Sequence, residues 1–345
     1  MTLDQVKSLV RKNVLQLSPY SSARDEFEGN ASVFLDANEN PFSTGYNRYP
    51  DPHQKELKKR LAELKGVAPE NIFLGNGSDE AIDLLFRAFC QPGLHNVLIP
   101  QPTYGMYKVS AEINEVAIKN VPLTDVFDLN FDAVSKNVDS NTRIIFLCSP
   151  NNPSGNLLSA NGIERIVNSF NGIVVIDEAY IDFASTPSWT EKLSTFNNLV
   201  ILQTFSKAWG LANLRLGMAF ASPFIISILN KIKPPYNING LTQKIAMEAL
   251  AKPEQTKRWV EEIIAERKRL EEKLTELASV EKVFHSDANF LLVKIQEARK
   301  KYERLLERGV VVRDRSNVQL CDNCLRITVG THVENEQLLN ALKAL

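Results

Sequence analysis

Short apolar runs alternate with helical stretches through the middle of the chain. The runs cover residues 96–99, 144–147, 173–176, 200–202 and 218–220, and each has the length of a buried strand. Continuous apolar residues, rather than alternating ones, are typical of strands that are covered on both faces. We therefore predict an α/β fold whose central sheet is mostly parallel and carries helices on both faces.

Two of these runs lead into residues that can carry chemistry. Asp177 closes the run at 173–176, and Lys207 follows the run at 200–202. Ligands of open α/β sheets bind beyond the carboxyl ends of the strands, so both side chains are expected in one site. A desolvated lysine is a nucleophilic amine suited to Schiff-base chemistry, and a carboxylate can pair with a protonated pyridine nitrogen. Taken separately, Lys207 could be a solvated surface lysine and Asp177 a helix cap.

Three more windows contain groups that suit a phosphorylated ligand. The segment 75–80 precedes a helical pattern at 81–89, and its glycines and helix start could receive an anion. Ser206 and Arg215 supply a hydroxyl and a guanidinium for a phosphate. Asn152 lies in a turn, Asn-Asn-Pro-Ser-Gly, that follows the run at 144–147, and its amide, with Tyr180, could hold a phenolate oxygen on a ligand's ring. The simpler alternatives are a helix capped by Ser78 or Asp79 and ordinary loop punctuation. Neither a Walker A loop nor a dinucleotide fingerprint is present.

These windows, in this order, resemble the fold-type I aminotransferases that depend on pyridoxal 5'-phosphate (PLP). The segments 37–41, 47–50, 102–107 and 324–331 are similar to the histidinol-phosphate aminotransferase subgroup, and the similarity runs from Tyr20 to Thr331. The resemblance implies ping-pong amino transfer between histidinol phosphate and 2-oxoglutarate, with imidazole acetol phosphate and glutamate as products, in histidine biosynthesis. Aromatic aminotransferases and threonine-phosphate decarboxylases share much of this pattern and remain alternatives.

The resemblance also assigns roles to individual residues. Lys207 would form the Schiff base with PLP and carry a proton, and Asp177 would pair with the ring nitrogen. The other cofactor contacts would be Asn152 and Tyr180 at the ring oxygen, Tyr104 on the ring face, and Ser78, Asp79, Thr204, Ser206 and Arg215 at the phosphate. Substrate contacts would be Arg326, Tyr20, Asn38, Arg313, and Tyr49, which would reach the cofactor and substrate from the neighbouring subunit of a homodimer.

Arg326 has two interpretations. A guanidinium binds phosphate and carboxylate alike, so this residue could grip both substrates in turn. On its own, however, the alternating segment 325–329 favours an arginine that points from a sheet edge into water. Ser154 and Asn213 stand where the family usually has threonine and glycine, which concerns loop geometry and not the reaction class.

Length and composition favour two lobes. The chain has 345 residues, of which 44% are hydrophobic, so it can bury a large core. We predict a large PLP-binding domain at 36–240 and a small α+β domain made of 1–35 and 241–345. In the second part the patterns predict a helix at 252–277, a helix at 302–306, and strands at 289–293, 310–312 and 325–327.

Charge and cysteine content argue against several other classes of protein. With 40 basic and 41 acidic residues, the net charge of −1 creates no field that would recruit nucleic acid or an anionic membrane. The sequence shows no leader of signal-peptide type, and we expect a cytoplasmic enzyme with small-molecule substrates. Cys321 and Cys324 have no second pair and the four histidines are scattered, so reduced structural thiols and no metal site are expected. The presence of Lys207, Asp177 and Arg215 together argues against a non-catalytic scaffold.

Overall fold

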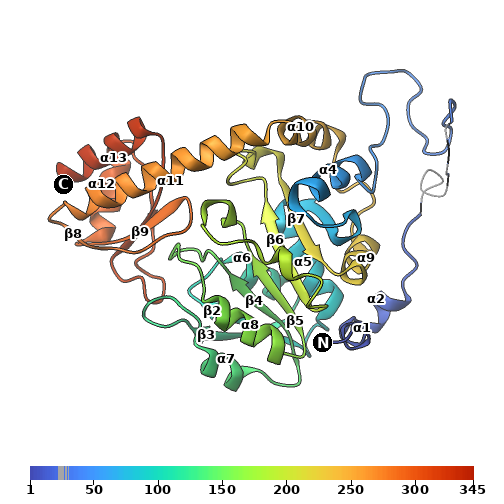
Figure 1. The fold of residues 1–345 in the computed structure, drawn as a ribbon, viewed down its shortest axis with the longest axis horizontal. Coiled ribbons are helices and arrows are strands. Elements are labelled where there is room, and N and C mark those ends of the chain that lie inside the picture. The colour runs from blue at the N-terminus through green and yellow to red at the C-terminus, as the bar shows by residue number, and fades with distance from the viewer. Residues whose placement is uncertain (22–26, 28, 30) are drawn as a thin grey trace.

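The computed structural model describes residues 1–21, 27, 29 and 31–345. Its larger body is built on a seven-stranded sheet with the order β1-β7-β6-β5-β4-β2-β3 (Figure 1). Neighbouring strands from β6 to β3 are parallel, and β7 is antiparallel to both β1 and β6. The strands are β1 (Ile72–Asn76), β2 (Asn96–Gln101), β3 (Ala117–Pro122), β4 (Thr142–Cys148), β5 (Ile173–Asp177), β6 (Leu199–Thr204) and β7 (Leu216–Ala221). The prediction of a mostly parallel sheet is confirmed.

Helices cover both faces of this sheet. Ile176 and Ile201 pack into the cluster on one face, whereas their neighbours Val175 and Val200 pack into the cluster on the other. Burial on both sides explains why the strands are continuously apolar. The first cluster includes residues of α4 (Lys55–Lys65), α7 (Phe131–Asn137), α8 (Ala160–Ser169) and α10 (Gly240–Leu250), and the second includes residues of α5 (Gly77–Phe89), α6 (Met106–Ile113) and α9 (Pro223–Ile232). Single 3-10 turns are η1 (Pro69–Asn71), η2 (Ile181–Phe183), η3 (Trp189–Lys192) and η4 (Ala212–Leu214).

The N-terminal helices α1 (Leu3–Leu9) and α2 (Lys12–Gln16) pack on the large body. Val6, Val10 and Val14 are buried in the cluster that contains α5 and α9. Arg11 N also donates to Ala88 O at 2.9 Å. The packing of these helices therefore differs from the expectation that residues 1–35 join the small domain, because their apolar stripe is covered by the large sheet's helices. The predicted boundaries at 36 and 240 stay predictions.

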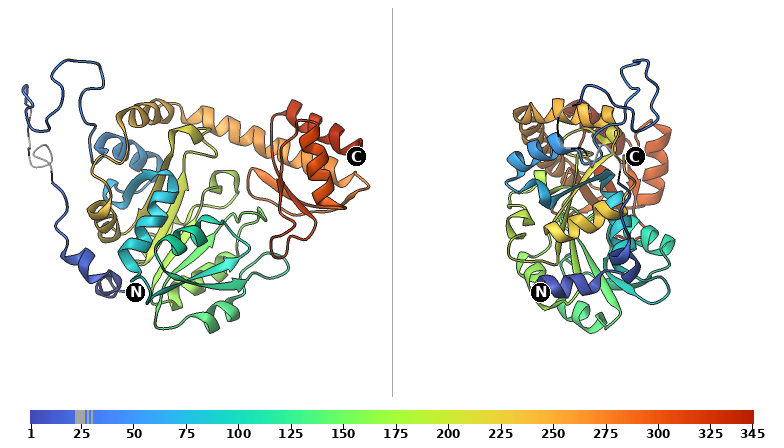
Figure 2. Two further views of the ribbon diagram at one scale, coloured as in Figure 1. Left: turned by 180° about the vertical axis from the view of Figure 1, so that it is seen from behind. Right: turned by 90° about the vertical axis from the view of Figure 1, so that its right-hand side faces the viewer.

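The C-terminal lobe is joined to the large body by the long helix α11 (Pro253–Thr275) (Figure 2). Its four-stranded antiparallel sheet has the order β10-β11-β9-β8 and packs against α11 and two further helices. The elements are β8 (Val280–Val283), β9 (Phe290–Ile295), α12 (Ala298–Glu307), β10 (Arg313–Asp314), β11 (Cys324–Thr328) and α13 (His332–Lys343). The predicted strand at 310–312 is wrong, since pairing starts at Arg313, opposite Arg326, while Val310 and Val312 pack on the lobe's core.

The two lobes meet at the turn after β4. Asp287 N donates to Gly155 O at 2.8 Å, and Leu157 N donates to Asp287 Oδ2 at 3.0 Å. A Cβ on Gly155 would lie 2.5 Å from Ser286 Oγ, so only glycine permits this approach. Within the described part of the chain, no helix combines the length and apolar character needed to cross a membrane.

Candidate active site

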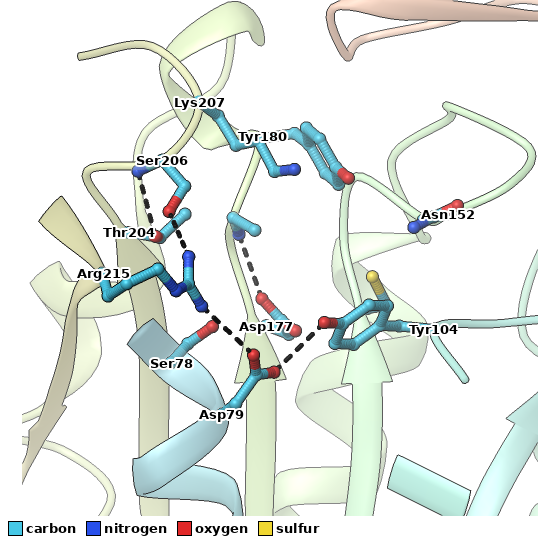
Figure 3. Close-up of a pocket in the computed structure, with 12 residues that line it drawn as sticks. Ser78, Asp79, Tyr104, Asn152, Asp177, Tyr180, Thr204, Ser206, Lys207 and Arg215 are labelled. Carbon is cyan, nitrogen blue, oxygen red and sulfur yellow. Dashed lines mark hydrogen bonds and ion pairs between the residues drawn. The ribbon is translucent and has the colours of Figure 1, made fainter. Parts of the chain in front are cut away.

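The carboxyl ends of the parallel strands and the start of α5 line a cavity (Figure 3). β4 ends at Cys148, β5 at Asp177 and β6 at Thr204, and these ends share one edge of the sheet. Ten of the predicted site residues line the cavity, namely Ser78, Asp79, Tyr104, Asn152, Asp177, Tyr180, Thr204, Ser206, Lys207 and Arg215. The fold thus brings together windows that are far apart in the sequence.

Asp177 is a buried carboxylate with a hydrogen bond to each oxygen. Tyr107 donates its hydroxyl to Oδ2 at 2.6 Å, and the backbone N–H of Ala179 donates to Oδ1 at 3.1 Å. Burial raises the pKa of Asp177 to about 6, although these two hydrogen bonds act in the opposite direction. A cationic group that entered the cavity would therefore find a strongly interacting partner here.

Lys207 extends from the turn after β6 towards Tyr180 (Figure 3). Its Nζ lies 5.4 Å from the centroid of the Tyr180 ring. Burial lowers the pKa of Lys207, and the positive charge of Arg326 lowers it further. Both effects favour the neutral amine, which is the nucleophilic form.

An anion cradle lies at the start of α5. Arg215 Nη1 donates to Ser206 Oγ at 3.4 Å, and Ser206 N donates to Thr204 Oγ1 at 3.1 Å. The helix begins without a side-chain cap, so Ser78 and Asp79 are not the caps considered from the sequence; they lie in its first turn. First-turn N–H groups and the positive end of the helix dipole favour an anion.

Two glycines beside this cradle have no room for a side chain. A Cβ on Gly217 would lie 2.1 Å from Ser78 N, and one on Gly77 would lie 2.7 Å from Arg215 Nη2. Gly77 also has a φ of 69°, a conformation that other residues adopt only with strain. Gly77 N donates to Arg215 O at 2.6 Å and ties the start of α5 to the start of β7.

Arg326 reaches the site from the small lobe. It lies on β11, an interior strand, and its Nη1 donates to Asn152 Oδ1. Its guanidinium carbon lies 5.3 Å from the centroid of the Phe290 ring, which in turn packs edge-on against Tyr180. Arg326 is only partly exposed, and the interpretation as a sheet-edge residue pointing into water is wrong.

The remaining predicted substrate contacts lie outside the cavity of this chain. Tyr49 and Asn38 line a separate depression, where Tyr49 stacks on Tyr236 with ring centroids 4.4 Å apart. Tyr20 is 70% exposed, and Arg313 is exposed on β10. Residues 31–50 run outside the body of the chain (Figure 1). A role for these side chains in the site therefore requires a second copy or a movement, and it stays a prediction.

Three residues near the site were not found from the sequence. Tyr107 contacts Asp177 from α6, and Cys148 lines the cavity beside it. Arg315 follows β10, and its buried Nε has no hydrogen-bond partner among the described residues. Burial and the neighbouring charge of Arg326 lower the pKa of Arg315. The sequence offered two signals that could have found them: Cys148 stands at the end of a predicted strand, and Arg315 is a second arginine two residues after Arg313.

The side chains in the cavity fit PLP. An amine with a lowered pKa, a buried carboxylate and an anion cradle match an aldehyde, a pyridine nitrogen and a phosphate in turn. In contrast, the described residues contain no cluster of three or more His, Cys, Asp or Glu side chains that could hold a metal ion. Cys321 and Cys324 are free and buried, and burial raises their pKa values to about 12 and about 11.

Comparison with known proteins gives concordant matches. A family model described as aminotransferase class I and II matches residues 30–345. The histidinol-phosphate aminotransferase of Parabacteroides distasonis is 59% identical over 341 residues, which cover 99% of each chain. Among solved structures, the histidinol-phosphate aminotransferase from Clostridium acetobutylicum has a TM-score of 0.80 and 24% identity, covering 87% of this chain and 91% of the other. The enzyme from Sinorhizobium meliloti, in complex with pyridoxal-5'-phosphate, has a TM-score of 0.78 and 25% identity, covering 86% and 82%.

Proposed function

Because this chain belongs to the class I and II aminotransferases, a PLP-dependent family, we propose that it transfers the amino group of histidinol phosphate to 2-oxoglutarate. The products would be imidazole acetol phosphate and glutamate, in histidine biosynthesis. The full-length similarity to a histidinol-phosphate aminotransferase supports this substrate pair. The observation that carries the proposal is the placement of Lys207, Asp177 and the anion cradle in one cavity, with Arg326 at its small-lobe side.

The cofactor and the chain divide the chemistry. When bound, PLP supplies an aldehyde that reacts with amines and a ring that accepts the electron pair released when a carbon next to nitrogen loses its proton. Asp177 would hold a positive charge on the ring nitrogen. The cradle of Ser206, Thr204, Arg215 and the first turn of α5 would anchor the phosphate. Tyr104, Tyr180 and Asn152 would orient the ring.

Lys207 would act both as the covalent anchor and as the base. Its lowered pKa favours the neutral amine, and once the substrate's amine has displaced it from the cofactor, Nζ could take the proton from the amine-bearing carbon of the substrate. Positioned proton transfer of this kind contributes on the order of 10²–10⁴ in rate.

Arg326 would bind the anionic end of either substrate. Histidinol phosphate has no carboxylate but carries a phosphate with roughly −1.5 to −2 charges at neutral pH. Glutamate and 2-oxoglutarate offer carboxylates instead. A guanidinium can form two parallel hydrogen bonds with either group, which suits an enzyme that binds its two substrates one after the other.

We also propose a cytoplasmic homodimer with shared sites. Tyr49 is half exposed on a segment that lies outside the body, and its neighbours Tyr46 and Phe42 are 76% and 79% exposed. A second copy could cover this apolar surface and receive Tyr49 in its own site. The four free thiols fit the reducing cytoplasm.

A donor screen tests the substrate proposal. The PLP-loaded enzyme is supplied with 2-oxoglutarate and with histidinol phosphate, phenylalanine or threonine phosphate, and glutamate formation is followed. We expect the highest kcat/KM with histidinol phosphate. Release of CO₂ from threonine phosphate without an acceptor would instead establish the decarboxylase alternative, and a higher kcat/KM with phenylalanine would establish the aromatic one.

Two lysine variants test the catalytic assignment. Lys207→Ala should abolish turnover and the covalent link to the cofactor that borohydride reduces in the unmodified enzyme. Lys268→Ala, on the exposed face of α11, is the control and should keep full activity. Activity close to that of the unmodified enzyme in Lys207→Ala would disprove the role of the amine.

A further inference from the structure

Tyr107 is fully buried directly behind the acid of the site. It lies on α6, has 0% exposure, and donates its hydroxyl to Asp177 Oδ2 at 2.6 Å. The other carboxylate oxygen accepts only the N–H of Ala179 among the hydrogen bonds of the described residues. Tyr107 is thus the one side chain, within the part of the chain that the structure describes, that donates a hydrogen bond to this acid.

Packing fixes the position of this hydroxyl. The Tyr107 ring stacks on Phe146 at a centroid distance of 4.8 Å, and it meets Tyr104 edge-on at 5.5 Å. Tyr104 is the residue predicted to cover the cofactor ring. A ring held between two others cannot turn its hydroxyl away, so the hydrogen bond to Asp177 is built into the core.

We propose that Tyr107 is a positioning residue for Asp177: its hydroxyl holds Oδ2 in a fixed direction and keeps the carboxylate negatively charged, so that the carboxylate would pair with the pyridine nitrogen of the cofactor. The inference rests on the proposed PLP-dependent function. A donor hydrogen bond stabilises the ionised carboxylate more than the protonated acid. Without it, the buried carboxylate would compete with the ring nitrogen for the proton that makes the ring an electron acceptor.

The other titratable groups around Asp177 affect its carboxylate by their charge or by their proximity, and none of those described donates a side-chain hydrogen bond to it. Asp79 on α5 raises the pKa of Asp177, whereas Lys207 after β6 lowers it. Cys148 on β4 and Tyr180 after β5 are also close, and burial raises both of their pKa values far enough to keep them neutral. Burial and the charge of Asp177 likewise raise the pKa of Tyr107 well above its usual value, so its hydroxyl remains a donor.

The variant Tyr107→Phe removes the hydroxyl and keeps the ring stacking. In the cofactor-free chain, carboxyl ¹³C NMR should show the Asp177 titration displaced upward by about one to two pH units, the effect of losing one hydrogen bond to a charged group. In the enzyme loaded with ¹⁵N-labelled PLP, the ring ¹⁵N resonance should move towards the unprotonated position. The kcat should fall about tenfold to a hundredfold, with KM for histidinol phosphate changed less than about twofold.

The matched control is Phe89→Leu, which removes a fully buried ring of the same cluster on α5 but keeps the Tyr107–Phe146 stack and the hydroxyl. It should lower the melting temperature and leave both NMR readouts where they are. Should Tyr107→Phe fail to fold, 3,5-difluorotyrosine in place of Tyr107 makes a stronger donor and should displace the Asp177 titration downward. An Asp177 titration that neither change displaces would overturn the proposal, even if activity were lost. If the unmodified enzyme failed to transfer amino groups, the proposed function would be wrong. The titration of Asp177 in the cofactor-free chain would still test the role of Tyr107.

Discussion

Arg326 Nη1 donates a hydrogen bond of 2.5 Å to Asn152 Oδ1, and so joins two side chains that are 174 positions apart. Arg326 belongs to the small-lobe sheet, whereas Asn152 follows β4 of the large sheet. Burial lowers the pKa of Arg326, although a guanidinium remains charged under physiological conditions. An anionic substrate would thus meet a cation that is already positioned between the lobes.

Replacement of Arg326 should weaken the binding of both substrates. We expect Arg326→Ala to raise KM for histidinol phosphate and for glutamate by about tenfold or more, because each charge-assisted hydrogen bond contributes about 1.5–3 kcal/mol. Arg326→Lys should recover only part of this loss, since an ammonium cannot form the two parallel bonds. Steady-state kinetics with each substrate varied in turn measures the effect.

Arg299→Ala is the control for the loss of an arginine in the same lobe. Arg299 pairs with Asp314 at 3.2 Å on the surface, and its side chain is 64% exposed. Its removal should leave both KM values unchanged. If Arg326→Ala raised KM for only one substrate, the shared use of the guanidinium would be wrong.

The approach of β7 to α5 predicts a second effect. In Gly217→Ala the new methyl group would lie 2.1 Å from Ser78 N and 2.3 Å from the carbonyl carbon of Gly77, both of them backbone atoms. The start of α5 must then shift, and overpacking of this kind costs about 1–3 kcal/mol. We expect PLP affinity, measured by fluorescence titration of the cofactor-free enzyme, to fall about tenfold or more. Gly105→Ala, which has open space around it and a φ of −68°, should bind PLP normally.

Much of the fold follows from the sequence because burial and strand direction leave clear patterns. The apolar runs locate β2, β4, β5, β6 and β7, and the end of β5 at Asp177 coincides with the end of its run. In contrast, the sequence does not show which part of the protein the first two helices pack against. Val6, Val10 and Val14 define an apolar stripe, but a stripe does not reveal which surface covers it. The two-residue strand β10 is also too short to produce a periodic signal.

The site residues likewise fall into those that the sequence could predict and those that it could not. Asp177 and Lys207 were found because both follow buried strands, and parallel strands place their ends at one edge of the sheet. Tyr107 could not be found like this. It is a buried aromatic residue on an amphipathic helix, which predicts core packing, and its contact with Asp177 spans 70 positions. The lobe contact of Arg326 likewise required the full fold, since local alternation favoured exposure.

Glu178, next to Asp177, predicts a pH dependence of stability. Its carboxylate accepts hydrogen bonds from Ser188 Oγ, Trp189 N and Gln203 Nε2, yet burial raises its pKa to about 6. Between the unfolded value near 4.5 and about 6, the folded chain binds more protons than the unfolded chain. This contribution to stability is therefore complete below the unfolded value and is lost as the pH rises through about 6, with a loss on the order of 2 kcal/mol.

Urea unfolding of Glu178→Gln and of the unmodified chain tests whether this contribution to stability falls as the pH rises. Both are studied without cofactor, at one protein concentration, between pH 4 and pH 7. The variant loses hydrogen bonds, but its stability relative to the unmodified chain should improve as the pH rises. Glu297→Gln should show the opposite trend, because a hydrogen bond from Lys300 lowers the pKa of Glu297. A constant difference for Glu178→Gln across this range would contradict the raised pKa.

The position of Tyr49 predicts that two inactive variants restore activity when they are mixed. Within one chain Tyr49 stacks on Tyr236 and lies outside the cavity, so a role in the site requires the neighbouring subunit. Tyr49→Ala should be nearly inactive, and Lys207→Ala fully so. In a mixed dimer, one site receives Lys207 from the first variant and Tyr49 from the second, whereas the other site lacks both. Random re-association after mild denaturation should then restore about one quarter of the normal activity, since half of the dimers are mixed and each has one intact site.

Tyr46→Ala, on the same segment, is the control and should be active by itself. A mixture without activity, with mixed dimers demonstrated by native mass spectrometry, would show that Tyr49 does not serve the partner's site.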